Sequence, residues 1–329
     1  MTIPHKTRPA RAALLLAAAA LALTGARAEA ADKYPSKTIE VITHAGAGGG
    51  TDVTTRMVLL QARRQLKTDM VVVNKRGGGG ATAMNYFITR PADGYTLLAF
   101  TVGHAATVVS KKTKMKLDDI IPVARGTDDP QILMVACKKS PYKTAKDFVA
   151  AQKTKQLSYG ITGVGTIDHV SAFMFTKRGG MKAPKVIAFK GGGEIATNLV
   201  AGNIDVGVLN YSEAAAQIEA GEICPLVVQA TERMALLPKV MTTKELGIDA
   251  HYSTVRGFAV LKGTPPDRVA ALEKGLVAAM KNPVYQAYLK SVGLTPQSVG
   301  DAKAWAAQIK SMSADMEAAL VELGFIKKK

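Results

Sequence analysis

Four glycine-rich stretches are the parts of this chain best suited to hold a small ligand. Each follows an apolar or strand-like run and leads toward a helical pattern. Glycine lets a ligand approach the backbone closely, and the N-terminus of a helix presents unpaired amides that attract an anion. The pattern therefore predicts anion binding by backbone amides, with a simple turn as the alternative for the second stretch. In chain order the stretches are 46-GAGGG-50, 77-GGGG-80, 163-GVG-165 and 191-GGG-193.

The first stretch does not fit a nucleotide loop. Gly46 and Gly48 match the start of the dinucleotide fingerprint GxGxxG, but Thr51 occupies its sixth position. No lysine followed by serine or threonine comes after the glycines, as a P-loop requires. The hydroxyls of Thr51 and Thr166 can instead add a donor to a carboxylate site. Because the stretches lie in different halves of the chain, they favour a cleft for an anion with two carboxylate ends.

Histidines at the ends of strands raise the alternative of a metal or acid–base site. His44, His104 and His169 all fall at or beside such loops. No carboxylate pair accompanies them apart from the adjacent Asp168, and the motifs GxSxG and HExxH are absent from the sequence. We therefore expect polar lining or structural roles for these histidines, and we predict no catalytic residue, metal or cofactor.

Strand and helix patterns alternate along the chain and place the glycine stretches at the carboxyl ends of strands. Apolar runs bounded by turn residues predict strands, and a 3.6-residue periodicity predicts helices. Such alternation is typical of an α/β fold with mostly parallel sheets, which binds ligands at the carboxyl ends of strands. The expected strands are 38–43, 71–74, 95–101, 132–137, 157–161, 185–189, 204–210, 223–228 and 255–261. The expected helices are 52–66, 81–89, 144–153, 170–179, 195–201 and 302–323, with more helix before the last one.

The first thirty residues predict a secretory signal peptide. A basic start precedes the apolar run 12–23, and the small residues of 24–31 offer a cleavage site near residues 28–30. The apolar run is too short to cross a bilayer as a helix, and an anchored N-terminal helix is the alternative. We expect the mature protein to be exported to the periplasm.

The chain is basic along its whole length. Its formal charge is +17, and cleavage after Ala30 would leave +14. The basic residues are dispersed, and aromatic residues make up only 5% of the sequence. Because a nucleic-acid groove usually combines charge with stacking platforms, we expect no nucleic-acid partner and favour a field that attracts small anions.

The chain contains two cysteines, Cys137 and Cys224, each within an apolar strand-like run. An oxidising compartment would allow one disulfide between them. Burial as free thiols is an equally good interpretation of the sequence, and their spacing does not suggest zinc.

Several motifs, in order and spacing, resemble the periplasmic solute receptors of tripartite tricarboxylate transporters, the Bug or TctC family. The resemblance covers about residues 34–326. Three positions depart from the common pattern: Ala47 and His44 stand where proline is frequent, and Phe189 stands where tyrosine is frequent. The matching motifs are 34-YPSK-37, the residues Gly48, Gly49, Asp52 and Arg56, then 74-NKRGGGG-80, 93-DGYTLL-98, 159-YGITGVGTIDH-169, 188-AFKGGGE-194, 202-GNID-205, 244-KELG-247 and 263-GTPPD-267.

The resemblance implies a two-lobed, Venus-flytrap binding protein of type II that is not an enzyme. It would comprise lobe 1 from residues 31–132 plus 250–329, and lobe 2 from residues 133–249. As a monomer it would bind a small di- or tricarboxylate and deliver it to the permease subunits of a tripartite tricarboxylate transporter. A sensory subunit that presents a carboxylate to a signalling receptor is the alternative, and an exported enzyme acting on organic acids is a weaker one.

The resemblance also suggests where the ligand lies. One carboxylate would be held by backbone amides of the first and third glycine stretches, and more variable residues would meet its other end. Arg256 is the expected charged contact, with a hinge salt bridge as its alternative, while Asp52 is expected to cap the helix or order the loop. The full set of expected site residues is Ala47, Gly48, Gly49, Gly50, Thr51, Asp52, His104, Gly163, Val164, Gly165, Thr166, His169, Lys190, Gly191, Asn210 and Arg256.

Overall fold

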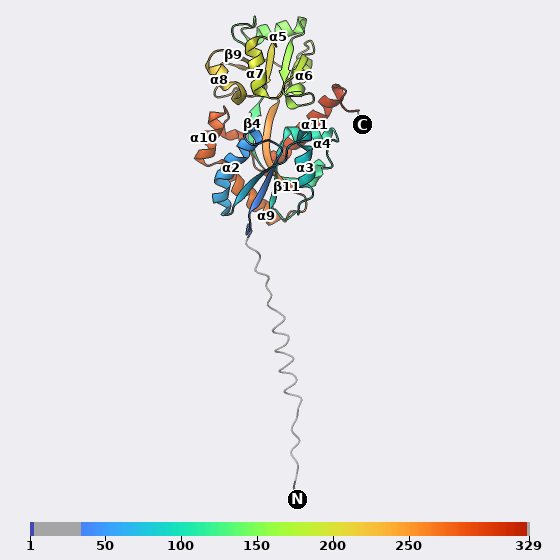
Figure 1. Cartoon of the computed structure of the whole chain (residues 1–329), viewed down its shortest axis with the longest axis vertical. Coiled ribbons are helices and arrows are strands. Elements are labelled where there is room, and N and C mark those ends of the chain that lie inside the picture. Colours follow the sequence, from blue (N-terminus) through green and yellow to red (C-terminus); the bar gives the residue numbers. More distant parts are fainter. Residues whose placement is uncertain (3–33, 328–329) are drawn as a thin grey trace.

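The computed structural model describes residues 1–2 and 34–327 of the chain. The expected signal peptide lies almost entirely outside these residues. Within them, no helix combines the length and apolar character needed to cross a membrane. The described part forms two lobes, each built around its own β-sheet (Figure 1). This is the mixed α/β, two-lobed fold that the sequence predicted.

The first sheet has five strands in the order β2-β1-β3-β11-β4. The strands β1, β2 and β3 are parallel to one another, whereas β11 runs antiparallel to both of its neighbours. Apolar side chains fill both faces: Val41 joins one core cluster and Ile42 joins another. Strands buried on both faces read as near-continuous apolar runs, as 39–43 does. The strands are β1 (Ile39–Thr43), β2 (Met70–Asn74), β3 (Thr96–Thr101), β4 (Ile120–Pro130) and β11 (Ser253–Leu261).

The second sheet has six strands in the order β10-β9-β5-β8-β6-β7. Here β5 alone runs antiparallel to its two neighbours, so each sheet contains one reversed strand. The reversed strands β5 and β11 are the ones that the chain enters as it crosses between the sheets. The strands are β5 (Ile132–Ala136), β6 (Ser158–Ile161), β7 (Lys185–Ala188), β8 (Val206–Leu209), β9 (Ile223–Val228) and β10 (Met241–Thr242).

Helices cover both sheets, and most of them begin after a loop that follows a strand (Figure 1). Around the first sheet lie α2 (Gly50–Leu66), α3 (Ala81–Phe87), α4 (Val102–Val109), α9 (Pro266–Met280), α10 (Pro283–Ser291) and α11 (Ala302–Glu322). Around the second sheet lie α5 (Ala145–Thr154), α6 (Ile167–Arg178), α7 (Gly192–Ala201) and α8 (Tyr211–Glu219). Three short 3-10 turns complete the order, η1 (Gly78–Gly80), η2 (Leu117–Asp119) and η3 (Pro296–Ser298).

The structure adds elements that the sequence did not predict and extends others. Strand β4 was missed because its sequence, IIPVARGTDDP, contains proline, glycine and aspartate, all of which are rare in strands. As an edge strand, β4 can accept proline, which cannot donate to a neighbour. The helices α4 and α8 were also missed. The helices α2, α6 and α7 begin two or three residues earlier than predicted, because glycine and polar residues are tolerated in a first turn.

Two strand connections cross between the lobes and are hydrogen-bonded to each other. Gln131 N of one connection donates to Tyr252 O of the other at 2.9 Å. Tyr252 N in turn donates at 3.0 Å to the carbonyl of Gln229, which directly follows β9. The helix α11 forms a further link. Near its start Trp305 packs on Phe100 of the first sheet, and near its end a Cβ on Gly165 would lie 3.7 Å from Leu320. The lobes are therefore joined by a compact hinge and bridged by one helix.

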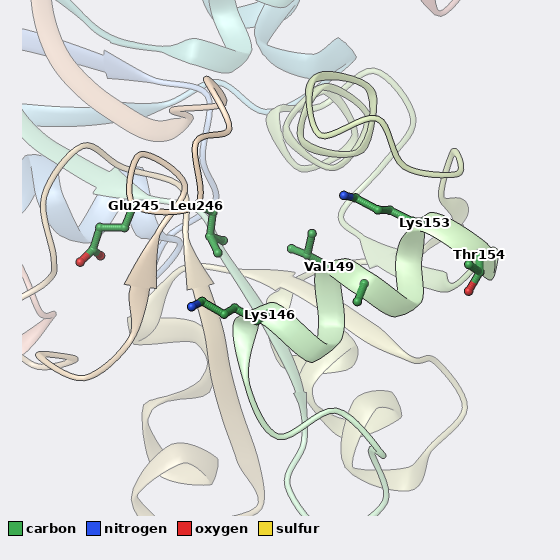
Figure 2. A pocket seen from close by; sticks show the side chains of 7 residues that line it. Lys146, Val149, Lys153, Thr154, Glu245 and Leu246 are labelled. Atoms are coloured by element: carbon green, nitrogen blue, oxygen red, sulfur yellow. The ribbon is translucent and has the colours of Figure 1, made fainter.

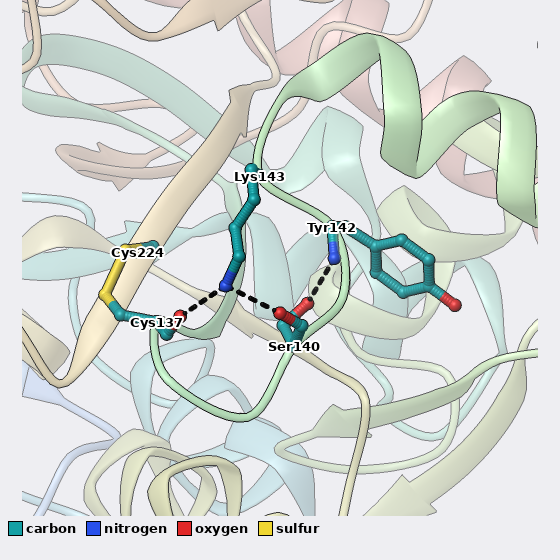
Figure 3. Close-up of a disulfide and its surroundings, with 5 residues drawn as sticks. All are labelled: Cys137, Ser140, Tyr142, Lys143 and Cys224. Atoms are coloured by element: carbon teal, nitrogen blue, oxygen red, sulfur yellow. Dashed lines mark hydrogen bonds between the residues drawn. A yellow bond between two sulfur atoms is a disulfide. The ribbon is translucent and has the colours of Figure 1, made fainter.

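The two cysteines form a disulfide, which settles the alternative left open by the sequence. Cys137 and Cys224 are 87 residues apart in sequence and join the end of β5 to β9 (Figure 3). Beside the bridge, Lys143 Nζ donates to the carbonyl oxygens of Cys137 and Ser140, both at 2.9 Å. The bridge thus fastens the turn after β5 to the neighbouring strand of lobe 2.

Candidate functional site

The loop between β1 and α2 is held in shape by Asp52. Asp52 Oδ2 accepts from Gly48 N and from Arg56 Nε, both at 2.9 Å, and Asn74 Nδ2 donates to Oδ1 at 2.8 Å. The hydrogen bond from Arg56 is the main cause that lowers the pKa of Asp52 to about 2. The side chain of Asp52 is only 1% exposed. Its carboxylate orders the loop, as expected from the sequence, and is already occupied by these partners.

The amides available to an anion lie at the start of α2. Gly48 N donates to Asp52 and Gly49 N donates to Gly46 O, so these two donors are already used. The first helical hydrogen bond runs from Val53 N to Gly49 O. The amides of residues 50–52 precede that bond and are the unpaired donors that every helix N-terminus presents. The expected backbone contact with a ligand carboxylate is therefore restricted to the amides of this first turn.

Arg256 lies against this same turn. It lies in β11, directly opposite Thr101 of β3 and Thr127 of β4. A Cβ built on Gly50 would lie 3.1 Å from Arg256 Nη2, and Arg256 Nη1 lies 3.8 Å from Asp129 Oδ2. The side chain of Arg256 is 17% exposed. The structure thus places the guanidinium beside the first glycine loop, where it adds positive charge to the helix N-terminus.

Two histidine rings pack on each other, and the charge of Arg256 acts on one of them, His44. His104 is completely buried and its Nδ1 accepts from Thr101 N at 3.0 Å, which caps α4. The rings of His44 and His104 meet edge to face with centroids 4.4 Å apart. Burial lowers the pKa of both, and in His44 burial together with the charge of Arg256 lowers it to about 4. Both rings are therefore neutral near pH 7, and His104 has a structural role.

In lobe 2 the loop before α6 is ordered by hydrogen bonds of its own. Asp168 Oδ2 accepts from Thr162 N at 2.8 Å, and Thr166 Oγ1 donates to Gly163 O at 2.7 Å. Gly165 N donates to His169 Nδ1 at 3.1 Å. Val164 is exposed, at 57%. The amide of Gly165 and the hydroxyl of Thr166 are thus engaged within the loop.

Free amides in lobe 2 begin at the first residue of the helix, as they do in α2. The first helical bond of α6 runs from Val170 N to Thr166 O, so the amides of residues 167–169 precede it. The helix α7 is preceded by Lys190, whose backbone amide donates to Glu194 Oε2 at 2.8 Å, and by Gly191, whose carbonyl accepts from Ile195 N at 3.2 Å. Several helix N-termini therefore stand at the strand ends of lobe 2.

Asn210 connects this part of lobe 2 to the end of β4. Its Nδ2 donates to Asp129 O and to Pro130 O, both at 3.0 Å, and its backbone amide donates to Glu213 Oε2 at 2.9 Å. Burial raises the pKa of both Asp129 and Glu213 to about 7. Neither carboxylate was among the residues expected from the sequence. The doublet 128-DD-129 just before the crossing was the available signal for the first of them.

Two cavities of the described residues are lined by none of the expected site residues. One of them is a surface hollow of about 450 Å³ formed by α5 and the turn after β10. Figure 2 shows the side chains that line it. A smaller cavity of about 50 Å³ lies between the lobes and is lined by Ile167, Tyr252 and Met316 among others. No group of three or more histidine, cysteine, aspartate or glutamate residues in the described part could hold a metal ion.

Known proteins resemble this chain over nearly its whole length. Residues 54–324 match the family described as the tripartite tricarboxylate transporter family receptor. The UPF0065 protein in the gbd 5′ region of Cupriavidus necator is 30% identical over 97% of both chains. A TctC solute-binding protein from Polaromonas is 29% identical with a TM-score of 0.79, covering 88% of this chain and 99% of its own.

A further solved structure shares the fold at lower identity. MatC from Rhodopseudomonas palustris, solved with bound malate, is 24% identical to this chain. Its TM-score is 0.72, and the match covers 87% of this chain and all of MatC. The expected two-lobed architecture is confirmed by these neighbours.

Proposed function

Because this chain belongs to the tripartite tricarboxylate transporter receptor family, we propose that it captures a small di- or tricarboxylate between its lobes. It would act in the periplasm and deliver the ligand to membrane permease subunits. The family consists of receptors rather than enzymes. The observation that carries the proposal is the position of Arg256 against the first turn of α2.

The electrostatics of lobe 1 support an anionic ligand. The unpaired amides at the start of α2 carry partial positive charge, and the guanidinium of Arg256 adds a full charge within the same few ångströms. The carboxylate of Asp52, the nearest negative group in this turn, is already paired with Arg56. A ligand carboxylate would therefore meet donors and a cation on this wall.

The second lobe supplies the other wall. The first turns of α6 and α7 follow strands of the second sheet, and Asn210 ties that sheet to the end of β4. Closure of the two lobes on a ligand requires contacts that exist only in the closed arrangement. Amides from α2 on one side and from α6 on the other would provide such contacts.

A thermal-shift screen tests the proposed ligand class. We would measure the melting temperature of the mature protein with a panel of di- and tricarboxylates, sugars and amines. Ligand that binds only the folded protein at one hundred times its Kd stabilises it by about 2.7 kcal/mol, which gives a clear rise in Tm. At least one carboxylate is expected to raise Tm. Delivery to a permease is tested separately, by uptake of the best hit in cells with and without the receptor.

A further inference from the structure

Buried polar atoms without a partner gather around Arg256. Within the described residues these atoms include Arg256 Nε, Thr127 Oγ1, Asp129 Oδ1 and His44 Nδ1. Thr127 lies directly opposite Arg256 in the sheet, and the charge of Arg256 acts on His44. Most buried polar groups in proteins have a hydrogen-bond partner. A cluster of unpaired ones therefore indicates where a polar group of a ligand would supply the missing hydrogen bonds.

The atoms in this group include both donors and acceptors. Thr127 and Asp129 are two residues apart on β4 and so project from one face of the strand, toward Arg256. The neighbouring Asp128 projects from the other face, where Oδ2 accepts from Gln308 Nε2 at 3.0 Å and pairs with Arg125. A ligand group that only accepts hydrogen bonds could satisfy Arg256 Nε but would leave Asp129 Oδ1 without a donor.

The charges at this point count against a bare second carboxylate. Asp129 is 97% buried and faces Arg256 at 3.8 Å, while Glu213 of α8 acts on Asp129 from lobe 2 as a second negative group. The positive charge of Arg256 acts on Asp129 in the opposite direction and lowers its pKa. At pH 8, above the pKa of Asp129 of about 7, a ligand carboxylate next to Arg256 would therefore lie beside an ionised buried aspartate that repels it, unless the ligand also offers that aspartate a hydrogen.

We propose that Asp129 is a specificity-determining residue, which favours carboxylates that carry a hydroxyl or ammonium donor beside the carboxylate held by Arg256. Acids of the same length without that donor would bind more weakly. The inference rests on the proposed function, because it assumes that a carboxylate enters this cleft. Asp129 would select among such carboxylates, whereas their capture depends on the other groups of the cleft.

The test compares acids of equal length by calorimetric titration at pH 8. Succinate is compared with malate and aspartate, and glutarate with 2-hydroxyglutarate and glutamate. A hydrogen bond to a charged group contributes about 1.5 kcal/mol or more, so the better donor-bearing acid is expected to bind about tenfold more tightly than its parent. In Asp129→Asn the negative charge is lost, and that ratio should fall below about threefold. Asp128→Asn, on the opposite face of β4, is the matched control and should keep the wild-type ratio.

Two results would overturn the inference: equal affinities of parent and donor-bearing acids in the wild type, or a wild-type ratio that persists in Asp129→Asn. If the variant did not fold, as judged by circular dichroism, the wild-type comparison would still decide. A protein that bound no carboxylate at all would instead refute the proposed function. The two failures are therefore distinguishable.

Discussion

The guanidinium of Arg256 lies against the backbone of Gly50, close enough that a Cβ added there would stand 3.1 Å from Nη2. This contact joins the reversed strand β11 to the first turn of α2. It combines a full positive charge with the amides of a helix N-terminus at one point of lobe 1.

Substitution of Gly50 should therefore weaken ligand binding without unfolding the protein. In Gly50→Ala the new methyl group would displace the guanidinium, and we expect about tenfold weaker binding of the best carboxylate, measured by calorimetry. Alanine is favoured over glycine within a helix by about 1 kcal/mol, which offsets the crowding. Gly103→Ala, in the first turn of α4, is the control because its Cβ would make only an ordinary van der Waals contact, 3.5 Å from Thr101 Oγ1. Unchanged affinity in Gly50→Ala would argue against this contact.

Loss of Asp52 should loosen the first glycine loop. Asp52→Ala leaves Gly48 N, Asn74 Nδ2 and the Arg56 guanidinium without their shared acceptor. We expect a loss of about 2 kcal/mol in the free energy of unfolding in urea, together with weaker carboxylate binding. Asp147→Ala is the matched control: Asp147 is an exposed acidic residue in the first turn of α5, and its loss should cost no more than about 0.5 kcal/mol. Equal losses in both variants would contradict the anchoring role.

The raised pKa of Asp129 predicts a pH-dependent difference in stability. Its folded pKa is about 7 against 3.8 for the ordinary group, so folding is favoured by this group below pH 4 and the advantage is lost as pH rises through 7. The free energy of unfolding of Asp129→Asn minus that of the wild type should therefore rise by about 2 kcal/mol from pH 5 to pH 8. Because the lowered pKa of His44 acts in the opposite direction, the comparison is made between variant and wild type at each pH. A difference that is constant across this range would contradict the prediction.

The disulfide should stabilise lobe 2 without contributing to the site. Cys137 and Cys224 close a long loop, for which the chain-entropy relation gives about 4.6 kcal/mol. We expect reductant to lower the Tm of the wild type clearly. The Tm of a Cys137→Ser/Cys224→Ser double variant should not change when reductant is added. Both forms should bind the same carboxylates while folded. A reduced protein with unaltered Tm would show that the bridge contributes little.

Much of the fold could be predicted from sequence because the buried strands read as apolar runs. Strands such as 39–43 and 132–136 pack on both faces, which leaves a clear pattern. Strand β4 left no such pattern, since an edge strand tolerates Pro122 and its pairing with β11 is fixed by residues more than a hundred positions away. That missed strand carries Asp129.

The candidate site was predictable in its loops but not in its hydrogen bonds. The glycine stretches identified the helix N-termini correctly. Which amides remain free depends on partners such as Asp52 and His169, and a single sequence cannot show that Gly48 N and Gly165 N are occupied. The contact between Arg256 and Gly50 likewise depends on β11, which lies between β3 and β4 and runs antiparallel to both.

The most direct test of the carboxylate site is a calorimetric titration of the best carboxylate from the thermal-shift screen into wild type and Arg256→Ala. We predict one ligand per chain for the wild type. For the variant we predict at least about tenfold weaker binding with the fold retained, because the cation beside α2 is removed. Equal affinity in both proteins would contradict the role of Arg256. Stabilisation by a sugar or an amine, with no response to any carboxylate, would contradict the account as a whole.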